Sequence, residues 1–198
     1  MTATAHETSP ETSSAAVPTL AATTGTWVLD PAHTRLGFTA KHAMVSKVRG
    51  SFNVFEGELV LDGENPANSR ARVVVDTTSI STGSDQRDEH LRGGDFLDVE
   101  KYPQMVFEST EVTQRAEDVF EMVGNLTIKD VTRPLTITAE LEGVNADPWG
   151  NTKIGFEGTS AFSRKDFGLT WNVALEAGGV LVSDKIVLTL DVQAAKQA

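Results

Sequence analysis

The sequence predicts an all-β protein, an extended antiparallel β-barrel of about eight strands with short helices inserted between two of them. Three observations favour this fold. From Trp27 onward, apolar and polar residues alternate with a period of two in run after run, as in strands with one buried face. Turn-forming residues separate these runs, and one short stretch breaks the alternation. Repeated alternation indicates antiparallel sheet, and closure into a barrel removes exposed strand edges.

The first residues of the chain form a polar segment rich in Thr, Ser, Ala and Pro. Such a composition buries too little apolar area to offset the entropy of ordering, so we expect a disordered tail over residues 1–25. Residues 26–195 are expected to form one barrel domain. The tail has no Lys or Arg and no continuous apolar run, which argues against a secretory signal. We therefore expect a cytoplasmic protein with no stable membrane insertion.

Strands with one inward face account for most of the patterned chain, and turns such as the 147–150 stretch separate them. Charged and hydroxyl side chains between the inward positions point outward. The inward residues are expected to be Leu36, Phe38, Ala40 and His42; Phe55, Leu59 and Leu61; Val73 and Val75; Phe120, Met122, Leu126 and Ile128; Leu135, Ile137, Ala139 and Leu141; Ile154, Phe156 and Phe162; and Ile186, Leu188, Leu190 and Val192.

The stretch 84–92 lacks alternation and is rich in helix formers. Ser84 can serve as its N-cap, and the Gly93-Gly94 pair ends it. Asp95 is expected to cap a second short helix that Pro103 terminates. The sequence therefore predicts two short helices between neighbouring strands.

The charge of the chain excludes several classes of partner. There are 28 acidic and 17 basic residues, a formal net charge of −11. Such a surface repels nucleic acids and anionic membrane faces, so no nucleic-acid partner is expected and an anionic ligand needs a local cationic site. The chain has no cysteine, which excludes disulfides, thiolate nucleophiles and cysteine metal sites.

Arg87, His90 and Arg92 lie close together on the first expected helix. They could form a cationic cradle for a phosphate or pyrophosphate, because Arg makes bidentate contacts with such groups. They could equally form ion pairs with neighbouring acidic residues on a solvated helix. Spacing alone favours the ion pairs.

Two further polar residues have inward parity. His42 shares the face of Phe38 near a strand end, where it could contact a polar ligand head or be a hydrogen-bonded core histidine. Arg164 keeps the parity of Phe162, and an inward arginine needs a partner because an unpaired buried charge is costly. Asp166 or a ligand anion could supply that partner, unless the segment is an exposed strand end.

Catalytic motifs are missing from the sequence. There is no GxSxG elbow, no P-loop and no GxGxxG after a strand, and nearly all carboxylates have outward parity. The alternative is a small metal-dependent or carboxylate hydrolase using His33, His42 and His90, although their spacing matches no metal motif. We therefore expect no catalytic residue, no metal and no cofactor. A barrel filled by its own side chains, serving as an interaction domain, is the third reading.

Several short stretches, taken in order, resemble one known family. They are 29–34 (LDPAHT) running to Phe38 and Lys41-His42, 48–52 (VRGSF), 55–57 (FEG), 87–92 (RDEHLR), 95–98 (DFLD), Tyr102-Pro103, 124–128 (GNLTI), 131–134 (VTRP), 163–168 (SRKDFG) and 178–184 (GGVLVSD). Their order and spacing are similar to those of the YceI-like, polyisoprenoid-binding proteins, from about Trp27 to the last strand.

The resemblance implies a lipocalin-like barrel that binds a polyprenyl phosphate, a polyprenyl pyrophosphate or a prenyl quinone, for storage, transport or stress protection. Many such proteins are periplasmic and carry a signal peptide, from which this chain departs. A homodimer is left open. The expected head-group residues are His42, Arg87, His90, Arg92 and Arg164. The residues expected along the tail, from strand parity and the resemblance, are Phe38, Ala40, Phe55, Val75, Met122, Leu126, Ile137, Phe156 and Leu188.

Overall fold

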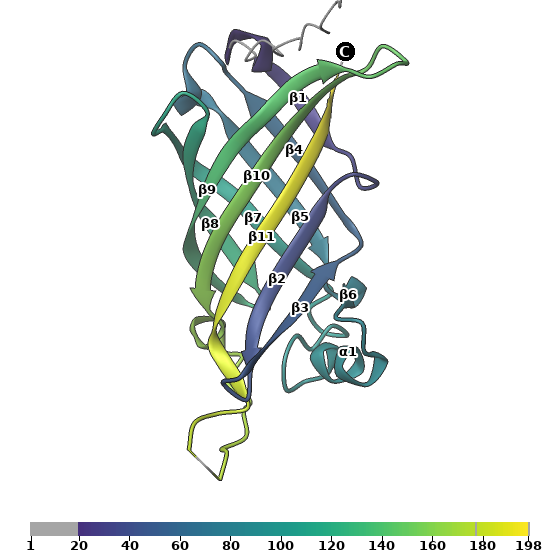
Figure 1. The fold of residues 1–198 in the computed structure, drawn as a ribbon, viewed down its shortest axis with the longest axis vertical. Helices are drawn as coiled ribbons and strands as arrows, with labels where there is room; N and C mark the ends of the chain where they lie inside the picture. Colours follow the sequence, from purple (N-terminus) through teal and green to yellow (C-terminus); the bar gives the residue numbers. More distant parts are fainter. Residues whose placement is uncertain (1–19, 177, 198) are drawn as a thin grey trace, which may run out of the picture.

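The computed structural model describes residues 20–176 and 178–197, which form an antiparallel β-barrel (Figure 1). The strands are β1 (Gly25–Leu29), β2 (Arg35–His42), β3 (Ser46–Phe52), β4 (Phe55–Leu61), β5 (Arg70–Asp76), β6 (Ile80–Ser81), β7 (Gln104–Gln114), β8 (Val119–Ile128), β9 (Val131–Ala146), β10 (Thr152–Ser163) and β11 (Val182–Lys196). The helical elements are α1 (Asp85–Arg92) and the 3-10 helices η1 (Leu20–Thr23), η2 (Pro66–Asn68), η3 (Thr77–Ser79) and η4 (Arg164–Phe167).

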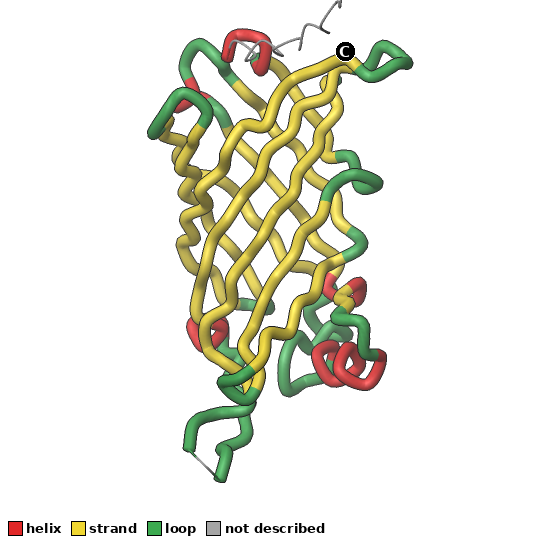
Figure 2. Tube along the Cα trace, in the orientation of Figure 1, coloured by secondary structure: helices red, strands yellow, loops and turns green. Residues whose placement is uncertain are grey.

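Eight strands close the barrel, which confirms the predicted fold class. They follow the order β1-β4-β5-β7-β8-β9-β10-β11, and β1 pairs with β11 to complete the ring. One edge of β11 pairs with two strands. Its last residues pair with β1, and residues 182–191 pair with β2. β3 then pairs with β2, and β6 pairs with β3. We call the end where β11 begins and α1 lies the lower end, and the opposite end the upper end (Figures 1 and 2).

Burial follows the predicted alternation most clearly in β9. Leu135, Ile137, Ala139 and Leu141 are buried, and each residue between them is exposed. Period-two burial on a long strand is what a sheet with one wet face requires. Inward residues of the other strands join this core, so the apolar side chains lie inside the barrel.

The 3-10 helix η1 lies within the segment that the sequence assigns to the tail. Residues 1–19 lie outside the described residues, but η1 packs on the upper end of the barrel instead of extending away from it. The fully buried Trp27 donates its indole N–H to the carbonyl of Thr23 at 2.8 Å. Gly63 approaches the carbonyl of Leu20 so closely that a Cβ there would overlap it. η1 packs there because the buried indole of Trp27 needs a hydrogen-bond acceptor and because Gly63 has no side chain to block η1.

The first of the two expected helices forms and the second does not. α1 starts after Ser84, whose side chain makes no capping hydrogen bond, and ends at Gly93. The residues from Gly94 to Leu97 form turns instead of a helix. Asp95 is not a cap there, because its carboxylate lies 2.9 Å from Nε2 of His90.

Candidate ligand-binding cavity

The barrel interior is hollow along much of its length. A lower cavity of about 650 Å³ lies beside α1, and an upper cavity of about 140 Å³ lies beneath η1. The lower cavity has the size of typical small-ligand sites, about 300–1,000 Å³. The residues that line both cavities are Leu36, Val73, Phe107, Ile137 and Leu190. The two cavities therefore meet at a position that is lined by these apolar residues.

The residues expected along the tail lie on these walls, with one exception. Phe38, Ala40, Val75, Leu126, Ile137 and Leu188 line the lower cavity, and Met122, Ile137 and Phe156 line the upper one. Phe55 lines neither cavity. It is opposite Val75 in the β4–β5 register, so its parity is inward, but its ring is buried in the main core cluster. Parity identifies an inward residue and does not show whether that residue faces open space.

The polar side chains of the lower cavity gather at its lower end. They are Lys41, His42, Ser84, Gln86, Arg87, His90 and Arg164. Lys41, His42, Gln86 and His90 are also exposed at the surface. The cavity therefore opens to solvent beside α1, and its mouth combines an apolar interior with a largely cationic rim.

Arg87 holds the start of α1 in place and still reaches the cavity. Its Nε donates to Oγ1 of Thr82 at 2.7 Å, and Nη2 donates to the carbonyl of Thr82 at 2.9 Å. The buried Asp88 accepts a hydrogen bond from the backbone N–H of Thr82 at 2.9 Å. The sequence offered two alternatives for Arg87, a phosphate cradle or ion pairs with acidic residues of the helix. The hydrogen-bond partner of Arg87 is instead Thr82.

Arg92 lies away from the cavity. Its Nε donates to the carbonyl of Thr78 and its Nη2 to the carbonyl of Ile80, both at 2.7 Å. Arg92 is not part of either cavity wall. Arg92 therefore links α1 to the preceding segment by hydrogen bonds. It does not lie with the other residues that were expected to contact the head group.

Arg164 is inward, as its parity predicts, and buried. Its guanidinium donates to the carbonyls of Leu169, Trp171, Val182 and Ser183 at distances of 2.6 to 3.4 Å. Burial lowers the pKa of Arg164, and the nearby charge of Asp184 partly opposes that change. Asp184, at 3.6 Å, is therefore its carboxylate partner, and Asp166 is not. Arg164 fastens both ends of the loop between η4 and β11.

Three rings join α1 to that loop beside the cavity. The centroid of the His90 ring lies 5.1 Å from that of Phe96 and 4.6 Å from that of Trp171, and both pairs meet edge to face. Phe96 and Trp171 are 5.3 Å apart. All three residues line the lower cavity, and we call them the mouth cluster.

The three histidines of the hydrolase alternative do not converge. His33 lies in the bend between β1 and β2, where it pairs with Asp30. His42 ends β2, seven residues beyond Arg35, a separation of about 23 Å along an extended strand. Among the described residues there is no group of three His, Cys, Asp or Glu side chains placed to hold a metal.

Several cavity residues were absent from the sequence expectations. Phe107 lines both cavities, but it lies in the continuous apolar run Met105-Val106-Phe107, whose residue types do not alternate. Trp171 and Phe96 lie in irregular segments where no periodicity exists. Their only sequence signal is that they are large aromatic residues outside the alternating runs.

The protein is an antiparallel barrel of lipocalin-like architecture, with a long apolar interior and a polar mouth. The YceI-like domain family matches residues 27–194, and the chain belongs to this family. In the described residues, no helix is long and apolar enough to span a bilayer.

Relatives of known sequence and structure agree with this membership. A UPF0312 protein of Yersinia pestis is 44% identical over 138 residues, covering 70% of this chain and 71% of its own length. A UPF0312 protein of Vibrio parahaemolyticus is 40% identical over 150 residues, covering 75% of this chain and 79% of its own length. The crystal structure of the Campylobacter jejuni YceI protein has a TM-score of 0.69 at 29% identity, covering 80% of this chain and 90% of that one.

A more distant structure shares the fold alone. It is described as a polyisoprenoid binding domain from Saccharophagus degradans, implicated in plant cell wall breakdown. It has a TM-score of 0.65 at 13% identity and covers 86% of this chain and 98% of that one.

Proposed function

We propose that the protein binds an isoprenoid lipid, with the apolar tail in the lower cavity and the polar head at its mouth. The observation that carries this proposal is the cavity of about 650 Å³, whose polar residues gather at one open end. The fold shared with a domain described as polyisoprenoid binding supports the same ligand class. The proposed role is to store or transport the lipid, or to protect against stress, through binding and not catalysis.

The tail supplies most of the binding free energy in this proposal. Burying one CH₂ group contributes about 0.8 kcal/mol, so an isoprene unit contributes roughly 3–4 kcal/mol. Several units together outweigh an association cost of about 4–15 kcal/mol. The head group then orients the lipid.

The rim favours a phosphate or pyrophosphate head over an uncharged quinone. His42, Arg87 and His90 line the mouth, with Lys41 beside them. Among the hydrogen bonds of the described residues, Arg87 uses Nε and Nη2 and leaves Nη1 for a ligand oxygen. Arg164 is committed to backbone carbonyls, so it shapes the mouth and holds the loop.

The proposal is tested by native mass spectrometry, before and after denaturation, followed by titration. A retained prenyl lipid gives a mass difference, and the same spectra report whether the protein is a homodimer. A prenyl pyrophosphate and a prenyl quinone are then titrated against Ala40→Trp, Arg87→Gln and the control Arg35→Gln at two salt concentrations. Ala40 lines the cavity and Arg35 is exposed outside it.

We expect Ala40→Trp to weaken both ligands, because it fills the space that both tails need. Arg87→Gln is expected to weaken only the pyrophosphate, by about 1 kcal/mol, the upper range for exposed charge pairs. If Arg87→Gln abolishes quinone binding while Ala40→Trp leaves it intact, the ligand does not lie in the barrel. Cell fractionation tests the expected cytoplasmic location.

A further inference from the structure

We propose that the lower end of the barrel docks on the surface of an anionic lipid bilayer, with the cavity mouth toward the membrane. Two adjoining features carry this inference: an exposed apolar tip and a row of cations beside it. Docking by itself does not depend on which ligand the cavity binds.

The apolar tip consists of Met44, Val45 and Val173. Met44 is 54% exposed, Val45 is 87% exposed and Val173 is 46% exposed. Met44 and Val45 lie at the turn between β2 and β3, where Ala43 and Met44 have φ values of 48° and 61°. Gly or Asn is strongly preferred in such a turn, so Ala-Met there is strained. The turn presents apolar side chains to solvent despite this cost.

Hydrogen bonds join the two loops of the tip into one surface. The backbone N–H of Ala43 donates to the carbonyl of Leu181 at 2.7 Å. The N–H of Leu181 in turn donates to the carbonyl of Val173 at 2.9 Å. The β2–β3 turn and the loop before β11 therefore extend together beyond the lower end of the barrel (Figure 1).

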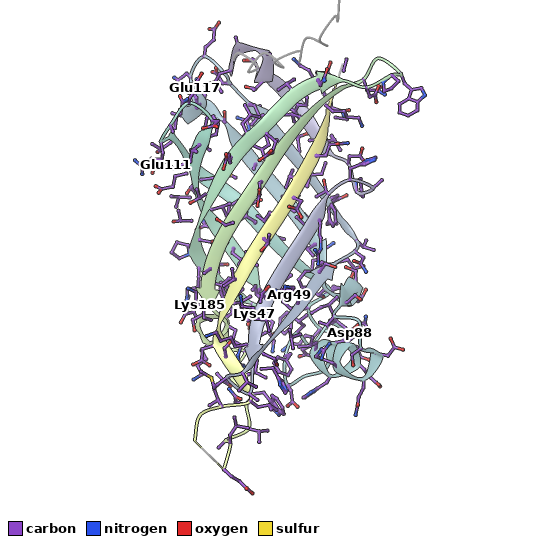
Figure 3. All side chains as sticks on the ribbon, in the orientation of Figure 1. Lys47, Arg49, Asp88, Glu111, Glu117 and Lys185 are labelled. Atoms are coloured by element: carbon purple, nitrogen blue, oxygen red, sulfur yellow. The ribbon has the colours of Figure 1, made fainter. Side chains whose placement is uncertain are left out.

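The cationic row consists of Lys41, Lys47, Arg49 and Lys185. Lys41 is directly opposite Lys47, and Arg49 is opposite Thr39 on the same face. Lys185 precedes Ile186, which pairs with Ala40 of β2. Figure 3 shows Lys47 and Arg49 of β3 and Lys185 of β11 in the lower part of the barrel, and β2, which carries Lys41, lies between these two strands.

These cations have no acidic partner within the described part of the chain. All four are exposed, and none takes part in the ion pairs of the described residues. Like charges directly opposite one another destabilise an antiparallel pair. The acidic residue nearest in sequence to Arg49 is Glu56, and Asp184, which precedes Lys185, already pairs with Lys165 at 2.9 Å. An anionic surface would relieve the repulsion that the row creates.

The net charge of −11 does not prevent such docking, because screening makes the contact local. The Debye length is about 8 Å at physiological ionic strength. β11 has 15 residues, so at about 3.3 Å per residue it is roughly 50 Å long. Glu111 and Glu117 lie toward the upper end (Figure 3), whereas the exposed Asp85 and Glu89 belong to α1 at the lower end. The docking proposal therefore departs from the expectation that the whole surface repels anionic membranes.

The upper end offers a competing apolar residue without matching charge. Trp149 is 84% exposed in the hairpin between β9 and β10. The carboxylate of Asp147 accepts its backbone N–H at 3.0 Å, which places a negative charge beside the indole. An anionic bilayer would favour the lower end, where the exposed apolar side chains have cations beside them.

Docking at the lower end would bring the mouth of the cavity to the bilayer. Lys41 belongs both to the cationic row and to the cavity wall. A membrane lipid could then enter the barrel without its tail crossing water. This last step rests on the proposed function, whereas the docking does not.

The experiment uses the full chain and isoprenoid-free vesicles of phosphatidylcholine, alone or mixed with phosphatidylglycerol, in co-sedimentation. The tip variants are Val45→Asp and the double variant Lys47→Gln/Arg49→Gln. The controls are Arg35→Gln, an exposed cation at the other end of β2, and Trp149→Ser at the upper end. Arg35 lies six residues from Lys41, about 20 Å along the strand.

We expect binding to the mixed vesicles only, weakened by salt. The double variant should lose about 25-fold in affinity, since each cation near such a surface contributes about fivefold, equal to about 1 kcal/mol. Val45→Asp should also weaken binding, and both controls should bind like the parent protein. Isoprenoid titration in solution should be unchanged in the tip variants, so that docking and ligand binding are read separately.

Equal binding to both kinds of vesicle, or an equal loss with Arg35→Gln, would overturn the proposal. It would also be overturned if the tip proved to be a contact between copies. In that case Val45→Asp would convert a dimer to a monomer in gel filtration, and no variant would bind vesicles.

Discussion

The imidazole of His90 and the indole of Trp171 meet edge to face, with ring centroids 4.6 Å apart and ring planes at 89°. His90 belongs to α1, and Trp171 belongs to the loop that Arg164 fastens. Both line the lower cavity. The contact therefore links two segments that are distant in sequence and lie together at the polar end of the cavity.

We expect Trp171→Ala to speed the release of a bound isoprenoid by about two- to tenfold, because an edge-to-face aromatic pair contributes about 0.5–1.5 kcal/mol. Stopped-flow displacement of a fluorescent prenyl ligand measures the rate. Trp149→Ala, which removes an exposed indole far from the cavity, is the control. Unchanged release from Trp171→Ala would mean that the mouth cluster does not restrict the ligand.

Gly124 on β8 leaves room for the ring of Phe107, which lines both cavities. A Cβ at this position would overlap that ring and would lie 2.6 Å from the carbonyl oxygen of Glu108. Gly124→Ala should therefore lower the free energy of unfolding by about 1–3 kcal/mol, as overpacking does. Urea denaturation measures the change. Gly94→Ala is the matched control, because nothing lies within 4 Å of its Cβ position, and an equal loss there would contradict the explanation.

Asp30 joins the β1–β2 bend to β10 and β11. Its Oδ2 accepts hydrogen bonds from Lys153 at 3.1 Å and from Gln193 at 3.2 Å, and it lies 3.1 Å from His33 Nδ1. Burial alone would raise the pKa of Asp30, but the hydrogen bonds from Lys153, His33 and Ala32 lower it to about 2 from 3.8. The ionised carboxylate therefore stabilises the fold above the unfolded-state pKa, and this contribution is lost as pH falls from about 4 towards 2.

Asp30→Asn should therefore reduce the free energy of unfolding at neutral pH by about 1–2 kcal/mol, given about 1.4 kcal/mol per unit of pKa change. Denaturation curves at neutral and acidic pH should show the difference from the parent protein shrinking as Asp30 becomes protonated. Asp191→Asn, at an exposed position on β11, should show little difference at either pH. A difference for Asp30→Asn that persists below pH 2 would exclude ionisation as its source.

Two truncations separate the residues before η1 from η1 itself. A chain that starts at Leu20 should unfold at the same temperature as the full chain. A chain that starts at Gly25 loses Thr23, the acceptor for the buried Trp27 N–H, and should lose about 1–3 kcal/mol, the cost of an unsatisfied buried donor. Thermal denaturation measures both. Destabilisation by the shorter truncation would show that residues before Leu20 also pack on the barrel.

Strand parity predicted most of the cavity wall, because a residue such as Ile137 needs only its own alternating neighbours to mark it as inward. It did not identify Phe107, which lies in the continuous apolar run Met105-Val106-Phe107, where the residue types do not alternate. It also placed Phe55 on the cavity, although packing between other core residues covers that ring.

Side-chain partners were less predictable than side-chain direction. The sequence showed Arg87, Arg92 and Arg164 as cations near a ligand or near acids. Their main partners are instead Thr82 and backbone carbonyls. Those acceptors come from turns and loops, whose paths no periodic pattern describes.

Local alternation and the order of motifs along the chain were enough to predict the family, the antiparallel barrel and the apolar character of its interior. The three-dimensional packing was needed to show that α1 and the loop containing Trp171 meet at one end, and that Lys47 of β3 and Lys185 of β11 lie there on either side of β2. Strand order and register set these proximities. They arise from packing between segments far apart in sequence, which local patterns do not encode.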